Sequence, residues 1–482
     1  MSHRLPLELW LLIAKDLESN RLSFTRYALV CRHWRAVFEP LLYSKVRVHS
    51  VDFKIDKGTM SLEKFQSLTS GRASRQTFIR NLDYTIILPY RLDDYRSVKL
   101  KGTYNEQNPV REANDEAFKA GVMALFRPLA SWCKGHQIFL TLQTLGREQA
   151  REPGTEAQCH ADQWQHVLDG EEVVRPYRAR FPHHDTSMLP QVGCVTELGF
   201  RVYYPFGDSH SIHCRGLQIL SLSTNELVRP DHLSYSRERR EAIARELPNL
   251  PSSLQTLNYW GTIEQPWSNI LPGLNLLGND DDLLSANIRQ LSLGLKELTL
   301  TMTSLGIDFL FPLDETCKPL PNVGLAWPLL EILEFKDVPY SLPSGEWLLD
   351  WDRYKWDDED IDDPTTAGIE IFDTGFMSGD AYIERDIISV EQLHRLFISL
   401  GYAARRMPRL IALEFDLVAL EHTFELLFVY ETFYPPCLEW ITPLGYLPDE
   451  RVAEAWGFRL EDYEVKGSAK AKEFLLIILE VS

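Results

Sequence analysis

The amino-acid sequence predicts an α/β protein, in which a small unit of three helices precedes a long, irregular array of strands and helices. Two observations support this prediction. Apolar residues recur at helical spacing within residues 1–45, and a short leucine pattern of the strand type returns several times within residues 217–415. With 482 residues, 44% of them hydrophobic, the chain can also bury a large core.

The first predicted helix opens at Leu5-Pro6. Proline suits the first helical position because the N–H that it lacks would be unpaired there. The apolar face that follows consists of Leu9, Trp10, Ile13, Ala14 and Leu17. A helix that packs only within its own domain needs a single apolar stripe, so this wider face indicates a partner.

A second helical stretch is expected to begin at Ser23, a suitable cap, and to end at Pro40. Residues 46–48 then have the pattern of a short strand. Three short helices form a core near the lower size limit for independent stability. A partner covering the surplus apolar surface is therefore expected.

These residues resemble an F-box, particularly that of fungal F-box proteins. The fragments that match are Leu5-Pro6-Leu7-Glu8-Leu9, Ile13, Leu17, Ala28-Leu29-Val30-Cys31-Arg32-His33-Trp34-Arg35 and Pro40-Leu41-Leu42-Tyr43. The resemblance implies that residues 1–45 dock on a Skp-type adaptor, which joins a substrate receptor to the cullin scaffold of an SCF-type ubiquitin ligase. It implies adaptor contacts from Leu5, Pro6, Leu9, Ile13, Val30 and Cys31, with Trp34 in the core of the F-box. The alternative is a helical cap that closes the first repeat of a larger domain.

The remainder, residues 46–482, is predicted to form one repeat domain. The repeated pattern is leucine-x-x-leucine-x-leucine or a close variant, with first leucines at Leu217, Leu254, Leu295, Leu330 and Leu410. It is typical of a leucine-rich repeat, in which the fourth and sixth positions point into one core. The spacing exceeds the roughly 20–29 residues of regular repeats, so each unit is expected to hold a full helix. The last interval would hold a degenerate repeat or an insertion.

The fifth and seventh positions of the pattern should face away from that core, because side chains alternate along a strand. Stacked strands would align them as one binding surface. The candidate substrate-binding residues are Trp260, Asn258, Thr299, Glu334 and Glu414. Two alternatives stay open: helices or loops cover this face, or a register error of one residue inverts the assignment.

Further elements are expected before the repeats. Residues 78–88, 138–145 and 195–204 have the pattern of strands, residues 113–133 that of an amphipathic helix, and residues 474–479 that of a terminal strand. Residues 148–190 and 346–366 are predicted as long loops. The second contains an acidic run mixed with aromatic residues, which indicates a solvated loop or a recognition element for a basic partner.

Charge and cysteine content narrow the function classes. The net charge of −19 disfavours binding to nucleic acid or to an anionic membrane, and no apolar run is long enough to span a bilayer. The seven cysteines are too sparse for a disulfide framework, which indicates free thiols in the cytoplasm or nucleus. The N-terminus carries charges that do not suit a signal peptide.

Known catalytic fingerprints are missing from the sequence. The nearest metal-like motif, His210-x-x-His213-Cys214, lacks a second ligand pair and is expected to be a solvated turn. The resemblance therefore implies a non-catalytic receptor that presents a protein target for ubiquitination and proteasomal degradation, without cofactor. The alternatives are a scaffold that binds the adaptor without joining a ligase, and an enzyme whose site is assembled from distant residues.

Overall fold

The computed structural model divides the chain into two compact units. Unit 1 comprises Met1–Asp94, Lys101–Glu156 and Pro176–Leu220, and unit 2 comprises Tyr95–Leu100, Ala157–Arg175 and Ser221–Ser482. The structure describes residues 9, 12–13, 24–51, 58–71, 73–93, 98–132, 135–157, 174–175, 177–181, 186–200, 213–223, 233–261, 273–278, 281–321, 324–350, 387–419, 422–429, 437–442, 446–460, 464–468 and 472–478. Both units contain parallel strands joined by helices, so the predicted α/β class is confirmed.

The N-terminal part of unit 1 contains two short helices, α2 (Phe24–Ala28) and α3 (Arg32–Ser44), followed by strand β1 (Lys45–His49). Two details of the prediction were wrong. The second helical stretch breaks at Leu29 and Val30, and the Cys31 side chain caps the new helix by accepting a hydrogen bond from the Trp34 N–H at 3.4 Å. Pro40 lies inside α3 and does not end it. Proline removes only one backbone hydrogen bond, and the helix continues because packing outweighs that loss.

The sheet of unit 1 has the strand order β2-β1-β3-β5-β7, with all neighbours parallel. Its strands are β2 (Thr59–Ser61), β3 (Asn81–Leu92), β5 (Ile138–Ala150) and β7 (Val195–Phe200), in addition to β1. The predicted strands near residues 78, 138 and 195 and the strand near residue 46 are thereby confirmed. Helices α4 (Leu62–Thr69) and α5 (Ala73–Phe78) connect β2 to β3. Two further short strands are β4 (Val98–Leu100), which belongs to unit 2, and β6 (Thr155–Ala157).

Helix α6 (Pro109–Ala130) confirms the predicted amphipathic helix and packs on β3. It begins with Asn108, whose side chain accepts hydrogen bonds from two backbone N–H groups, and with Pro109 in the first turn. The Tyr84 hydroxyl of β3 donates to the Gly121 carbonyl of α6 at 2.8 Å. A Cβ atom at Gly121 would lie 2.8 Å from the Ile86 side chain, so glycine permits this close approach.

The predicted loop at residues 148–190 is partly wrong. Its first residues continue β5, and the Glu152 carboxylate is buried against Arg111 with an Nη2–Oε2 distance of 3.2 Å. Later in the segment, the Tyr177 hydroxyl donates to Asp115 of α6 at 2.8 Å. These contacts join residues far apart in the sequence, which local composition does not reveal. Residues 158–173 lie outside the described residues.

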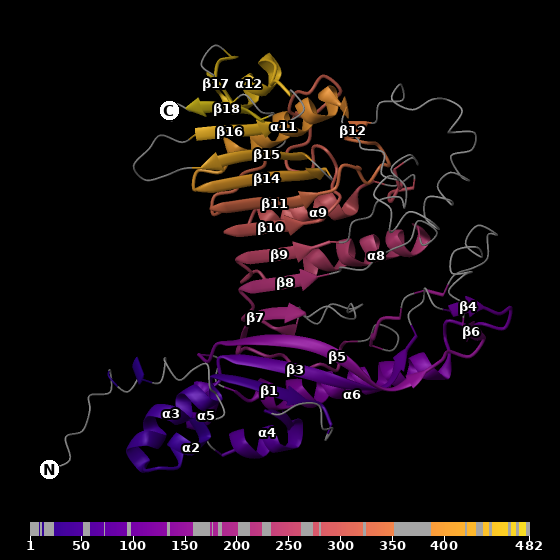
Figure 1. The fold of residues 1–482 in the computed structure, drawn as a ribbon, viewed down its shortest axis with the longest axis vertical. Coiled ribbons are helices and arrows are strands. Elements are labelled where there is room, and N and C mark those ends of the chain that lie inside the picture. The colour runs from indigo at the N-terminus through magenta and orange to yellow at the C-terminus, as the bar shows by residue number, and fades with distance from the viewer. Residues whose placement is uncertain are drawn as a thin grey trace. The chain divides into compact units, whose positions relative to one another are not determined.

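Unit 2 contains the leucine patterns. Strands β9 (Thr256–Trp260), β10 (Glu297–Thr301), β11 (Ile332–Val338) and β14 (Ala412–Ala419) run parallel in this order (Figure 1). Four antiparallel strands extend this sheet in the order β15-β16-β18-β17, and their bounds are His422–Val429, Cys437–Thr442, Lys472–Ile478 and Glu464–Ser468. Strand β18 confirms the predicted terminal strand. Strand β8 (Ile219–Ser223), which carries the first leucine pattern, crosses the boundary between the units.

Helices precede three of these four parallel strands. Helix α8 (Leu233–Glu246) with the short 3-10 helix η7 (Leu247–Asn249) precedes β9, α9 (Leu283–Ser292) precedes β10, and α11 (Val390–Ala404) precedes β14. Phe397 of α11 packs edge-on against Phe415 of β14, at 5.8 Å between ring centroids. Among the described residues, helix α12 (Glu450–Trp456) follows the parallel strands. Its Trp456 indole donates to the Phe397 carbonyl at 2.9 Å.

The expected helix between β10 and β11 is missing from the described residues of that interval, 302–321 and 324–331, so that prediction was wrong. Prolines at positions 312, 319, 321 and 328 disfavour a helix there. The buried Trp327 fills space beside α9, and its indole N–H donates to the Ser292 hydroxyl at 2.7 Å. Strands β12 (Leu349–Asp350) and β13 (Ile387–Ile388) pair in the long interval before β14, where residues 351–386 lie outside the described residues.

Replacement of Ser292 by Ala should lower the free energy of unfolding by about 1–3 kcal/mol, because the buried Trp327 N–H then lacks its acceptor. Urea unfolding followed by circular dichroism measures this change. The double variant S292A/W327F should lose less than the sum of the two single variants, because both remove one interaction. Fully additive losses would show that this hydrogen bond does not stabilise the segment between β10 and β11.

Candidate functional site

The structure provides two candidate interaction surfaces, one in each unit. The first consists of exposed apolar residues near the N-terminus. Leu9, Leu12 and Ile13 have helical backbone conformation, and their side chains are 43%, 60% and 39% exposed. In the turn between α2 and α3, Leu29 is 71% exposed and Val30 is 61% exposed. Large apolar side chains with this exposure mark a surface that a partner can cover.

Helices α2 and α3 pack around a small aromatic core. Phe24, Ala28, Val37 and Phe38 are buried, and the half-buried Trp34 packs against them, with its ring centroid 5.8 Å from that of Phe38. Trp34 thus contributes to the local core, as the sequence predicts. Cys31 is exposed and caps α3. Leu5 and Pro6, which the resemblance assigns to the same contact, lie outside the described residues.

The second surface is the outward face of the parallel strands in unit 2. Register pairs Asn258 of β9 with Thr299 of β10, Thr299 with Glu334 of β11, and Glu334 with Glu414 of β14. Four of the five candidate substrate-binding residues therefore lie in one row. The fifth, Trp260, pairs with Thr301, which in turn pairs with Lys336, in the row beside it. The predicted alignment of these residues across the strands is confirmed.

Burial alternates along the strands as the pattern requires. Leu298 and Leu300 of β10 are buried, whereas Glu297, Thr299 and Thr301 are half-buried. The same alternation holds on β11, where Leu333 and Phe335 are the buried residues. The register is therefore the predicted one, and the fifth and seventh pattern positions face away from the core.

Hydrogen bonds connect the row across neighbouring strands. The Asn258 amide donates to the Ser221 hydroxyl at 3.3 Å, and the Thr299 hydroxyl donates to the Glu334 carboxylate at 3.0 Å. Lys336 Nζ lies 3.0 Å from a Glu334 oxygen and 3.7 Å from a Glu414 oxygen. Its hydrogen bond to Glu334 raises the pKa of Lys336 above the ordinary lysine value, so the side chain stays charged.

Trp260 is the most exposed aromatic side chain of this surface, at 45%, and its indole N–H donates to the Met302 sulfur at 3.3 Å. Lys336 is the seventh position of the pattern that starts at Leu330, so the sequence places it on the same face as Trp260. It did not reveal that Lys336 bridges two carboxylates, since that contact depends on the register of β11 against β14.

A polar cluster that the sequence did not indicate joins α11 to α12. Arg451 donates two hydrogen bonds to the Glu391 carboxylate, at 2.6 and 2.7 Å, and one to Asp449 at 2.7 Å. His394 Nδ1 lies 3.4 Å from Asp449, and the Cys317 sulfur lies 3.9 Å from both Glu391 and Arg451.

This cluster has the residue types of a thiol-based active site without its chemistry. Burial raises the pKa of the Cys317 thiol, whereas a nucleophilic cysteine requires a lowered pKa. The polar contacts of Cys317 given above are to Glu391 and Arg451, and the Glu391 carboxylate, whose pKa is lowered by Arg451, is a weak base for a thiol. The cluster therefore acts as a clamp between two helices.

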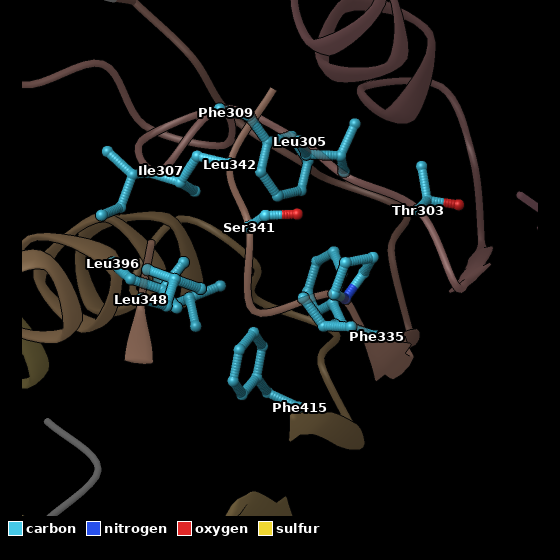
Figure 2. A pocket seen from close by; sticks show the side chains of 14 residues that line it. Thr303, Leu305, Ile307, Phe309, Phe335, Ser341, Leu342, Leu348, Leu396 and Phe415 are labelled. Atoms are coloured by element: carbon cyan, nitrogen blue, oxygen red, sulfur yellow. The ribbon is translucent and has the colours of Figure 1, made fainter. Parts of the chain in front are cut away.

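A cavity of about 30 Å³ is lined by residues that follow β10 and β11 and by side chains of β11, β14 and α11 (Figure 2). Phe309, Phe335, Phe415 and Leu396 are among its mostly apolar lining residues, and the hydroxyl side chains there are Thr303 and Ser341. This volume accommodates about one water molecule. It is too small for a metabolite-sized substrate, and it lacks converging titratable groups.

The metal-like motif differs from the expected solvated turn. His213 and Cys214 are buried, and a β-bridge joins Cys214 to Val192. Burial lowers the pKa of His213, which favours the neutral ring. Within the described residues, no group of three or more metal-ligating side chains occurs. His210 and the acidic run that begins after Asp350 lie outside those residues.

The described helices include none with the length and apolar character required to cross a membrane. Comparison with known proteins found no match among protein-family models, curated proteins or solved structures.

The Arg451 clamp predicts a pH-dependent contribution to stability. The hydrogen bond from Arg451 lowers the pKa of Glu391, so its contribution is present above the usual glutamate pKa of about 4.3 and is lost as the pH falls below it. Arg451→Met should cost about 0.2–1 kcal/mol at pH 7, because the pair is largely exposed. Urea unfolding at several pH values should show the difference shrinking below about pH 4. Arg409→Met, at an exposed position of the same unit, serves as the control, and an equal cost there would contradict the assignment.

Proposed function

We propose that this chain is the substrate receptor of an SCF-type cullin ubiquitin ligase. Residues 1–45 act as an F-box that docks on a Skp-type adaptor, and the leucine-rich-repeat-like solenoid of the remaining chain holds a target protein. The chain itself performs no chemistry. It positions the target for ubiquitination by other subunits, which leads to proteasomal degradation in the cytoplasm or nucleus.

The observation that carries this proposal is the exposure of five large apolar side chains, Leu9, Leu12, Ile13, Leu29 and Val30. Four of these residues, all except Leu12, belong to the fragments that resemble an F-box, and three of them, Leu9, Ile13 and Val30, are among the adaptor contacts that the resemblance implies. The core formed by α2 and α3 is small and aromatic. Burial of a fully exposed side chain of this size contributes about 1.5–3 kcal/mol, and a partner that covers these partly exposed residues would gain a part of that for each one.

The second support comes from unit 2. An aligned row of polar side chains beside an exposed tryptophan suits contact with another protein. The cavity described above is small and apolar, so the outward sheet face is the better candidate for holding a target.

Val30→Asp should reduce co-purification of the adaptor at least about tenfold, because a carboxylate would be buried against an apolar partner. Quantitative pull-down of the tagged chain measures this loss. Val51→Asp is the matched control, since Val51 is an exposed valine of the same unit outside residues 1–45. It should leave adaptor binding unchanged.

The pair Leu5→Asp and Pro6→Ala tests the residues that the resemblance implies. Adaptor binding that survives both this pair and Val30→Asp would rule out the F-box. Probing the same pull-down for the cullin separates a ligase receptor from a scaffold: adaptor without cullin would indicate the scaffold.

A further inference from the structure

We propose that the outward face of β9, β10, β11 and β14 binds an extended segment of the target protein that is rich in arginine or lysine. This inference rests on the proposed receptor function and specifies the chemistry of the target. It is carried by the charges on the face, by the position of Lys336 between two carboxylates, and by the exposure of Trp260.

Negative charge predominates on this face. Glu297, Glu334 and Glu414 are half-buried on three neighbouring strands. Among the described side chains that face outward from β9, β10, β11 and β14, Lys336 is the one cation. Since the whole chain also carries a net charge of −19, a cationic segment is attracted to this surface and an acidic one is repelled.

A single ammonium group shares the carboxylates Glu334 and Glu414 across two strands, at 3.0 and 3.7 Å. The side chains of Lys336 and Glu414 are each 39% exposed, so an incoming cation can reach them. A guanidinium group can bind a carboxylate through two parallel hydrogen bonds, which an ammonium group cannot. An arginine of the partner can therefore take the place that Lys336 occupies in the free protein.

Trp260 provides the second contact for such a segment. Its side chain is 45% exposed in the row that contains Thr301 and Lys336. A cation placed over an indole face is stabilised by the ring electrons, and arginine is the side chain most often found there. Aromatic and carboxylate groups on one face thus select the same partner chemistry.

The spacing of these groups fits an extended peptide that crosses the strands. Parallel strands lie about 4.8 Å apart, so β9 and β14 are separated by roughly 14 Å. An extended chain rises about 3.3 Å per residue, and four residues cover this distance approximately. Side chains four residues apart in an extended segment point to the same side. One cationic side chain can then contact Trp260 while another contacts Glu414.

Fluorescence anisotropy with the full-length chain tests this inference. The probe is a labelled peptide of roughly ten residues with two arginines four positions apart, and the matched peptide has glutamine at both positions. The arginine peptide should bind at least about tenfold more tightly, and its affinity should fall as salt is added.

Three variants locate the binding to this face. The pair E334Q/E414Q should weaken binding of the arginine peptide by about tenfold, and W260A by a similar factor. The pair E241Q/E454Q removes the same charge from exposed positions on α8 and α12 and should change the affinity less than about twofold. K336Q should tighten binding, because it removes the cation that competes for both carboxylates. Tighter binding by K336Q cannot arise from unfolding. Circular dichroism verifies that the other variants are folded.

Several results would overturn the inference. Equal affinity for the two peptides would do so, as would equal losses in E334Q/E414Q and E241Q/E454Q. Binding that persists in E334Q/E414Q but disappears when Asp357, Asp358, Glu359 and Asp360 are neutralised would assign it to the acidic run instead. The adaptor pull-down distinguishes failure of this inference from failure of the receptor function. If the chain binds the adaptor but does not prefer the arginine peptide over the glutamine peptide, only this inference is refuted. Peptide binding without adaptor binding refutes the receptor function.

Discussion

The leucine side chains on the inner face of the repeated strands are the interaction on which unit 2 depends. Leu298, Leu300, Leu333 and Leu413 are almost completely buried. Each contributes about 1.5–3 kcal/mol relative to an exposed position, and a shift of one residue would turn the leucines of a strand toward solvent. The free energy lost by exposing these leucines far exceeds any preference of the outer side chains for one register. The composition of the outward face is therefore a consequence of how the inner face packs.

The row formed by Asn258, Thr299, Glu334 and Glu414 follows directly from this register. Its polar groups form hydrogen bonds with one another across the strands, and Lys336 forms ion pairs with two of the carboxylates. A surface organised in this way keeps its side chains in place before a partner arrives, which lowers the entropy lost on binding. Helices pack against the buried face, as Phe397 against Phe415 illustrates, and the outward side chains keep their access to solvent.

In the N-terminal part of unit 1, the same hydrophobic effect acts on a segment that is too short to bury all of its apolar side chains. The core of Phe24, Ala28, Val37 and Phe38 accommodates few further side chains, and Leu29 and Val30 remain exposed. Short helices also leave turns between them, and Cys31 satisfies the backbone at one such turn with its sulfur. Association with another protein is the usual means of stabilising a core of this size.

The sequence by itself determined the α/β class, the principal strands and the inward direction of the leucines, because periodicity is a local property of the chain. It also placed Trp260 and the row residues on one face. It did not reveal the irregular segment before β11, the break at Val30, or the Arg451 clamp. Those features depend on partners distant in sequence: Trp327 packs beside Ser292, and Glu391 meets Arg451. Only the tertiary structure could decide them, since the energy of each lies in a contact between segments that local patterns do not connect.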